Sequence, residues 1–263
     1  MKNPKILITN DDGIESPGIE ILERVAAQLS DDVWVVAPQA ERSGTAHSIT
    51  LTSTIRTRPL GDRRVAVEGT PTDCVVIAVD HVLDGPPDIV LSGVNKGPNA
   101  AEDILSSGTC AAAMEAAARG IPAVSLSQDL VFPGPVHWDT AEHYAGPLVA
   151  YAIEHGMPEA VYWVINFPPV PVDEVKGIEV TIQSHRSPYS WTSIESHDPR
   201  GGVHYWLHRE RAAIELTEEG TDLGALERGL ISLAPLTLQM TAGEHRQAIQ
   251  EDVGTLFRAA SRA

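Results

Sequence analysis

The chain has 263 residues, 43% of them hydrophobic, and a formal net charge of −17 from 36 acidic and 19 basic side chains. The apolar fraction excludes wholesale disorder, and the acidity disfavours a nucleic acid polymer as partner, because phosphate backbones are bound by clustered Lys and Arg. The N-terminal residues lack a signal-peptide pattern, and no apolar run approaches the roughly 18 residues that span a bilayer. We therefore expect a cytoplasmic protein that does not bind membranes.

The first half of the chain alternates short apolar runs with helical patterns. Helices are predicted after Ser16-Pro17, from Thr70-Pro71 to about Leu83, and over Thr109–Arg119. Residues around 48–68 alternate apolar with polar side chains, which predicts a hairpin or another β excursion. Strands are predicted at Lys5–Thr9, Val33–Ala37, Asp88–Leu91 and Ala123–Leu126. This order indicates an α/β fold in which helices cover both faces of a mostly parallel sheet.

Beyond about residue 130 the periodicity weakens. A helix is predicted over 139–155 and a strand over Val161–Phe167, with further helical segments near 221–229 and 245–260. Between them, residues 168–209 are rich in Pro, Ser, His and Trp. We expect this half of the chain to complete the sheet and to add a projecting arm.

Polar, glycine-bearing loops follow three of the predicted strands. They are Asn10–Gly13, Glu41–Gly44 and Ser92–Asn95. Ligands of an open parallel sheet bind beyond the carboxyl ends of its strands, so the three loops are expected to meet in one crevice. The carboxylates of Asp11 and Asp12, with Ser and Asn oxygens nearby, suit Mg²⁺, Mn²⁺ or Ca²⁺. The alternative is that Asp12 only caps a turn.

The segment Ser106–Thr109 precedes the Ala-rich helix. Free amides and small hydroxyl side chains at a helix start form a ready anion site. The alternative is that Ser107 serves only as the N-cap. Next to the loop that follows Asn95, the segment becomes a candidate phosphate seat. Neither a P-loop nor a G-x-S-x-G elbow is present, so we favour water activated by a metal ion as the attacking group.

Four blocks of the sequence carry a resemblance to a known family. They are ITNDDGIESPGIEIL at 8–22, VVAPQAERSGTAHSITL at 35–51, GTPTDCV at 69–75 and PDIVLSGVNKGPNAAEDILSSGTCAAAMEAAARGIPAVSLS at 87–127. In their order and spacing they resemble the SurE family (survival protein E), bacterial and archaeal 5′/3′-nucleotidases. Weaker matches follow in VINFP at 164–168 and TDLGALERGLISLAPL at 221–236.

The resemblance implies a single domain over 1–263 with a Rossmann-like sheet sandwiched by helices. The core with the active site is expected at 1–130 and a protruding β-hairpin arm at 168–209. Residues 236–263 are expected to form a swapped C-terminal extension that supports oligomerisation, as a homodimer or homotetramer. The aromatic side chains of the arm would pack at such an interface or stack on a nucleobase.

The resemblance also implies an activity, the hydrolysis of nucleoside 5′(3′)-monophosphates to nucleoside and phosphate. One divalent cation per subunit, Mg²⁺ or Mn²⁺, would be held by residues matching Asp11, Asp12, Ser43 and Asn95. The expected catalytic residues are Asp11, Asp12 and Asn99, and the expected phosphate contacts are Gly44, Asn99, Ser107, Gly108 and Thr109.

Two alternatives to this activity stay open. One is an exopolyphosphatase acting on short chains, and the other is a nucleotide-binding module without turnover on the same fold. Two positions depart from the family pattern: Ala101 stands where Gly is common, and Ser106 where Tyr is usual. Neither matches a metal ligand, so the departures bear on substrate preference, loop flexibility or rate.

Overall fold

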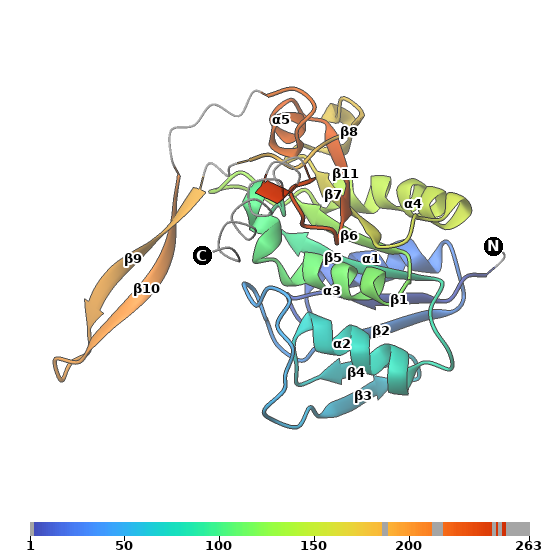
Figure 1. The fold of residues 1–263 in the computed structure, drawn as a ribbon, viewed down its shortest axis with the longest axis horizontal. Helices are drawn as coiled ribbons and strands as arrows, with labels where there is room; N and C mark the ends of the chain where they lie inside the picture. The colour runs from blue at the N-terminus through green and yellow to red at the C-terminus, as the bar shows by residue number, and fades with distance from the viewer. Residues whose placement is uncertain (1–2, 186–188, 212–217, 244–245, 247–248, 251–263) are drawn as a thin grey trace, which may run out of the picture.

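The computed structural model describes the chain except residues 1–2, 186–188, 212–217, 244–245, 247–248 and 251–263. Its main body is a nine-stranded sheet in the order β3-β4-β2-β1-β5-β6-β7-β11-β8, with helices on both faces (Figure 1). The strands are β1 (Ile6–Thr9), β2 (Val33–Pro38), β3 (Thr57–Gly61), β4 (Arg64–Val67), β5 (Ile89–Lys96), β6 (Ala123–Gln128), β7 (Val161–Phe167), β8 (Ile178–Val180) and β11 (Ile231–Thr237). The β3–β4 and β7–β11 pairs are antiparallel and the other neighbours are parallel, which confirms the expected fold class.

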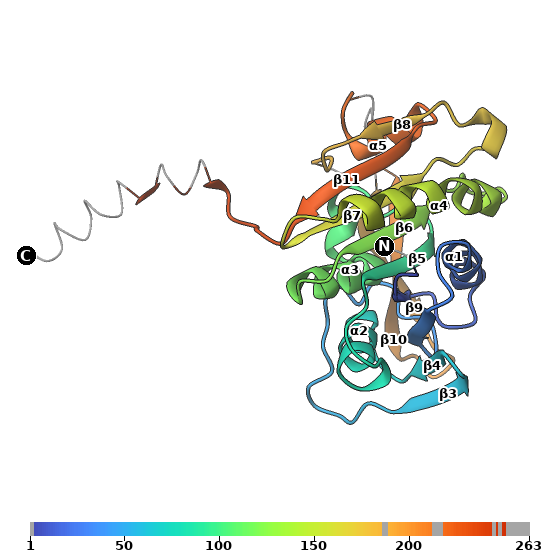
Figure 2. The same cartoon turned by 90° about the vertical axis from the view of Figure 1, so that its right-hand side faces the viewer.

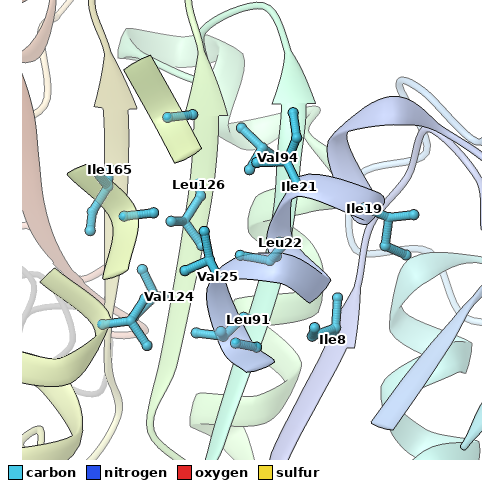
Figure 3. Close-up of a cluster of buried hydrophobic side chains, with 14 of the residues drawn as sticks. Ile8, Ile19, Ile21, Leu22, Val25, Leu91, Val94, Val124, Leu126 and Ile165 are labelled. Atoms are coloured by element: carbon cyan, nitrogen blue, oxygen red, sulfur yellow. The ribbon is translucent and has the colours of Figure 1, made fainter. Parts of the chain in front are cut away.

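Two pairs of helices enclose the sheet. Helices α1 (Pro17–Ala27) and α4 (Trp138–His155) cover one face, and α2 (Pro71–Ile77) and α3 (Gly108–Ala118) cover the other (Figure 2). Because side chains alternate along a strand, Ile6 and Ile8 pack in the cluster under α1, while Leu7 packs with α2 and α3. Figure 3 shows the α1 side of this core, where Leu22 and Val25 lie over the strands.

The helix starts that border the carboxyl edge of the sheet are fixed by local signals. Helix α1 begins at Pro17 after the extended Ser16, as predicted. At the start of α2, Thr70 and Asp73 form a capping box, in which each side chain accepts a hydrogen bond from the other residue's backbone amide. Helix α3 begins after Ser107, whose hydroxyl oxygen accepts a hydrogen bond from Cys110 N at 3.0 Å. The helix starts are therefore well-defined positions for site residues.

The second half of the chain differs in detail from the expectation. Residues 168–209 were expected to form the arm, but β8, within that range, belongs to the main sheet and pairs with β11. The projecting hairpin consists of β9 (Tyr189–His197) and β10 (Val203–Arg211), so it begins later and extends further (Figure 1). A short helix, α5 (Asp222–Glu227), matches the segment predicted near 221–229.

The hairpin exposes large apolar side chains. Trp191, Tyr205 and Trp206 are 60%, 62% and 66% exposed. The expected C-terminal segment 236–263 begins inside β11, and much of it, with most of the helix predicted over 245–260, lies outside the described residues. Among the residues that the structure describes, none of the helices combines the length and apolarity that crossing a membrane requires.

Candidate active site

The three polar loops meet at the carboxyl edge of the sheet. Arg42 N, in the loop after β2, donates to Asp11 O at 2.7 Å, and Ile14 N donates to Pro38 O at 2.8 Å. Lys96 N, at the end of β5, donates to Asp12 Oδ2 at 3.3 Å. These bonds join the loops after β1, β2 and β5 around the two adjacent carboxylates, as their positions in the sequence predicted.

The carboxylate of Asp11 lies in the body of the protein, against the start of α3. It is 4% exposed, Thr109 Oγ1 donates to its Oδ1, and the backbone amides of Gly108 and Thr109 also interact with it. A Cβ on Gly108 would lie 2.8 Å from Asp11 Cβ, so only glycine permits this approach. Burial raises the pKa of Asp11 above its ordinary value, although these hydrogen bonds oppose the rise.

Asp12 is half-buried beside Asp11. Burial, followed by repulsion from the Asp11 carboxylate, raises the pKa of Asp12 to about 6. Two carboxylates that each resist ionisation are stabilised as anions when a cation lies beside them. The donor set of carboxylate, hydroxyl and amide oxygens therefore fits a hard divalent cation.

The other two expected metal ligands are arranged differently. Ser43 is exposed on the loop after β2, and its hydroxyl donates to Glu41 Oε1 at 3.0 Å. Its neighbour Gly44 has a φ of +74°, and no atom lies within 4 Å of the position where a Cβ would be, so a ligand can approach the backbone there. Asn95 is half-buried near the end of β5, and its side-chain nitrogen donates to Gly97 O at 2.9 Å.

Asn99 belongs to a buried amide network. Its side-chain nitrogen donates to Ser127 Oγ at 2.9 Å, and its backbone is held on both sides by Asn166. Asn99 N donates to Asn166 Oδ1 at 2.8 Å, and Asn166 Nδ2 donates to Asn99 O at 3.0 Å. Asn99 is thus fixed from the ends of β6 and β7, next to the loop that follows β5.

Comparison with known proteins gives a consistent result. The family model described as "Survival protein SurE" matches residues 6–190. The 5′-nucleotidase SurE of Paramagnetospirillum magneticum is 47% identical over 94% of this chain and 94% of its own. The 5′-nucleotidase SurE of Parvibaculum lavamentivorans is 46% identical over 97% of this chain and 93% of its own. The chain belongs to the SurE family.

The fold agrees with this membership. The crystal structure of the SurE protein from Aquifex aeolicus superposes with a TM-score of 0.81 at 36% identity, over 94% of this chain and 99% of that one. The resemblance inferred from the sequence is confirmed, and the curated relatives carry the enzyme class that was expected.

Sequence reasoning missed the residues that position this SurE-family site. Asn166 interrupts the apolar strand Val161–Phe167 one residue before its end, and this amide within a buried strand was the available signal. Asp222 Oδ2 accepts from Ala101 N at 2.9 Å, and Gln183 Nε2 donates to Ala101 O at 2.7 Å. Ala101 has a φ of +52°, in the left-handed region that favours glycine. The backbone from 99 to 101 is therefore clamped by three distant side chains.

A further set of contacts holds the loop that carries Ser43 against helices α2 and α3. Thr50 N and Oγ1 donate to Asp73 Oδ1 and Oδ2 at 3.0 and 2.7 Å, and Thr70 Oγ1 donates to Ser48 O at 2.7 Å. His47 Nε2 lies 3.1 Å from Glu115 Oε2. Burial opposes ionisation of Asp73, but the hydrogen bonds from Thr50 and Thr70 outweigh it and hold its pKa below the ordinary value. We call residues 42–50 the strap.

Proposed function

We propose that this chain is a metal-dependent phosphomonoesterase that hydrolyses nucleoside 5′(3′)-monophosphates to nucleoside and phosphate. The observation that carries the proposal is the pair Asp11 and Asp12, held together at the carboxyl edge of the sheet between the end of β5 and the start of α3. The relatives named 5′-nucleotidase support the substrate class.

Asp11, Asp12, Ser43 and Asn95 would hold one divalent cation, Mg²⁺ or Mn²⁺. When bound, it would offset the charge of the phosphate and activate the attacking water. The hydrogen bond from Thr109 fixes the Asp11 carboxylate, so its orientation does not depend on the ligand. Ser43 would have to turn from Glu41 toward the site, which an exposed loop allows.

The phosphate group would lie against Gly44, Asn99 and the residues Ser107–Thr109. The positive end of α3 supports negative charge at this place, and in the structure the Asp11 carboxylate already faces it. Asn99 would hold a phosphate oxygen or orient the water. One N–H of the Asn99 side-chain amide donates to Ser127. The second N–H is left for a phosphate oxygen, and the carbonyl oxygen of Asn99 is left to accept from the water.

Substitution of the two aspartates tests the proposal. Phosphate release from AMP and GMP would be measured with Mg²⁺ or Mn²⁺ for Asp11→Asn and Asp12→Asn, with Asp31→Asn as an exposed control. We expect each site variant to lose about 100-fold or more in kcat, the order seen when one transition-state-stabilising group is removed. Folded site variants with wild-type rates would overturn the assignment. EDTA should abolish turnover, and full activity in EDTA would exclude a required exchangeable cation.

We also propose that the chain assembles as a homodimer or homotetramer through the β9–β10 hairpin and the 236–263 segment. Support comes from the exposed Trp191 and Trp206 on the hairpin, since aromatic residues are enriched at protein interfaces. Sedimentation of a Trp191→Ser, Trp206→Ser variant checks this, and an unchanged mass would contradict it. Location in the cytoplasm stays a prediction.

A further inference from the structure

A cavity of about 450 Å³ opens beside Asp12 on the face of the sheet that α1 and α4 cover. The first residues of both helices, which lie side by side (Figure 2), contribute to its wall. We call it the α1–α4 cavity, and its principal lining residues are Asp12, Pro17, Gln39, Lys96, Val136 and Trp138. Small-molecule sites have volumes of about 300–1,000 Å³, so the cavity has the size of a ligand site.

The cavity is continuous with the proposed catalytic site. Asp12 belongs to both, and Lys96, whose backbone amide binds Asp12 Oδ2, forms the adjacent wall. A second cavity, of about 290 Å³, lies near Gly120 and Met157, at the opposite edge of the sheet, and contains none of the site residues. A phosphate ester bound at Asp12 therefore has the α1–α4 cavity next to its reacting group.

The wall of the cavity is preformed on the α1 side. Asn10 Nδ2 donates to Gly13 O at 2.9 Å and to Ser16 Oγ at 2.7 Å, which fixes the turn that leads into α1. Gly18 lies so close to β5 that a Cβ there would be 1.9 Å from Val94 O. Neither contact depends on a ligand, so a ligand would meet a surface that is already ordered.

The chemistry of the wall suits a neutral organic group better than a second phosphate. Trp138, Val136 and Pro17 present apolar surface, while Gln39 and Lys96 offer hydrogen-bond donors. The ionisable residues of this wall are one cation, Lys96, and two carboxylates, Asp12 and Glu15, so the wall does not carry a net positive charge. A polyphosphate carries charge on every unit and fits such a wall poorly. A nucleoside has a flat base that stacks on aromatic rings and a sugar that forms hydrogen bonds.

We propose that the α1–α4 cavity binds the nucleoside part of a nucleoside monophosphate, with its base on Trp138 and its sugar near Lys96. This inference rests on the proposed function, because it assumes that the phosphate lies at Asp12. It assigns a selectivity role to Trp138, which is half-buried and packed against the core under α1. The nucleobase is then recognised within one chain.

The test compares an ester with a base and an ester without one. kcat and KM would be measured for AMP and for glycerol phosphate in the wild type, Trp138→Ala and Trp138→Phe. Loss of base stacking should lower the ratio of kcat/KM for AMP to that for glycerol phosphate about tenfold or more in Trp138→Ala. Trp138→Phe should recover most of the ratio, because an aromatic face remains.

A matched control separates recognition from packing. Trp163 is also half-buried against the same core cluster, but it lies outside the cavity wall. Trp163→Ala should leave the substrate ratio at the wild-type value. If Trp138→Ala lowers kcat/KM for both esters equally, or changes neither, the cavity does not select the nucleoside and the proposal is overturned.

A second variant covers the case in which Trp138→Ala fails to fold. Val136→Trp would fill the cavity from its loop, and it should lower the same ratio about tenfold or more. Equilibrium dialysis with adenosine gives a readout without turnover, and both cavity variants should weaken adenosine binding about tenfold. Adenosine binding unaltered by either variant would overturn the proposal.

Failure of this inference differs from failure of the proposed function. A wild-type protein that hydrolyses both esters with the same kcat/KM, or prefers polyphosphate, would overturn the nucleoside cavity and leave a metal-dependent phosphatase intact. A wild-type protein that releases phosphate from none of these substrates, with Mg²⁺ or Mn²⁺ present, would overturn both.

Discussion

The two halves of the candidate site are held in different ways. Asp11 and Asn99 are buried and hydrogen-bonded to the core, whereas Ser43 lies on the exposed strap. The buried half is positioned by β1, α3 and the ends of β6 and β7. The strap is positioned by a few hydrogen bonds, and two of them join Thr50 to the carboxylate of Asp73. Damage to the buried half should therefore affect both stability and catalysis, while damage to the strap should affect catalysis at a small cost in stability.

The largest effect on stability is expected from Asn166→Leu. The substitution removes both bonds to the backbone of Asn99 and leaves a buried amide and a buried carbonyl without their partner. Each of the two groups costs about 1–3 kcal/mol, so the free energy of unfolding should fall by about 2–6 kcal/mol. Catalytic efficiency should fall about 10- to 100-fold, as for other groups that orient a site.

Urea unfolding and phosphate release from AMP measure both quantities for Asn166→Leu. The control is Ser232→Ala in β11, which removes a buried hydrogen bond of 2.8 Å between the hydroxyl groups of Ser232 and Thr181. The control should lose stability and keep its kcat/KM. An equal loss of kcat/KM in the two variants would mean that Asn166 acts through stability alone.

The next effect is expected from Gly108→Ala. The new Cβ would lie 2.8 Å from Asp11 Cβ and 3.0 Å from Pro71 Cγ, so Asp11 or α3 must shift. Overpacking of this kind costs about 1–3 kcal/mol, and the shift should weaken Mn²⁺ binding. Calorimetry measures both effects. Gly61→Ala, where no atom lies within 4 Å of the new Cβ, is the control that should change neither.

Much of the fold follows from local patterns, and the exceptions have physical causes. The strand Val161–Phe167 was predicted with its observed bounds, because all of its residues except Asn166 are apolar or aromatic. Strand β11 was missed, since Pro235 argues against a strand inside a sheet. In the described residues β8 pairs with β11 only at Ile231–Leu233. Pro235 lies beyond that pairing, where β11 has a neighbour among the described strands on one side only, so the missing N–H of proline costs no hydrogen bond to β8. Strand β8 has three residues, too few for a periodic signal.

The site residues also divide into those that a local pattern predicts and those that it does not. Asp11 and Asp12 follow a strand directly, so the sequence predicted their place at the edge of the sheet. Asn166 and Asp222 are 67 and 121 residues from the backbone that they hold, and no local pattern connects them to it. Ser107 was assigned both as an N-cap and as a phosphate contact; the first role is present in the structure, and the second stays a prediction.

A smaller effect is expected from Thr50→Val in the strap. The substitution removes the hydroxyl that donates to Asp73 Oδ2 and keeps the shape of the side chain and the backbone bond. One such bond contributes about 1 kcal/mol. kcat/KM for AMP should fall a few-fold because the strap that carries Ser43 is held less firmly. A loss of about 1 kcal/mol would leave the protein folded, so unfolding would not account for this decrease. The Asp73→Asn, Thr50→Val double variant checks whether the two groups act as a pair.

The strap contribution should also depend on pH. The pKa of Asp73 is lower in the folded chain than in the unfolded one. Its stabilising effect is therefore fully present above the unfolded pKa of about 3.9 and is lost as the pH falls through the lower, folded value. The difference in unfolding free energy between wild type and Thr50→Val should be constant from pH 7 to about pH 5 and shrink below pH 4. A difference that persists in acid would show that the bond does not need the carboxylate.

The smallest effect is expected from Ala101→Gly, beside the buried half. A left-handed backbone costs a non-glycine residue about 1–2 kcal/mol, and Ala101 adopts it with φ +52° while its methyl group is fully buried. Glycine removes the cost of the left-handed backbone, but it also removes a buried methyl group that contributes about 0.8 kcal/mol. The free energy of unfolding should therefore rise by no more than about 1 kcal/mol. Because Asp222 and Gln183 hold the backbone and not the methyl group, kcat/KM should stay within about twofold. A large loss of activity would mean that the conformation of this segment depends on the alanine itself, and that the clamps alone do not position Asn99.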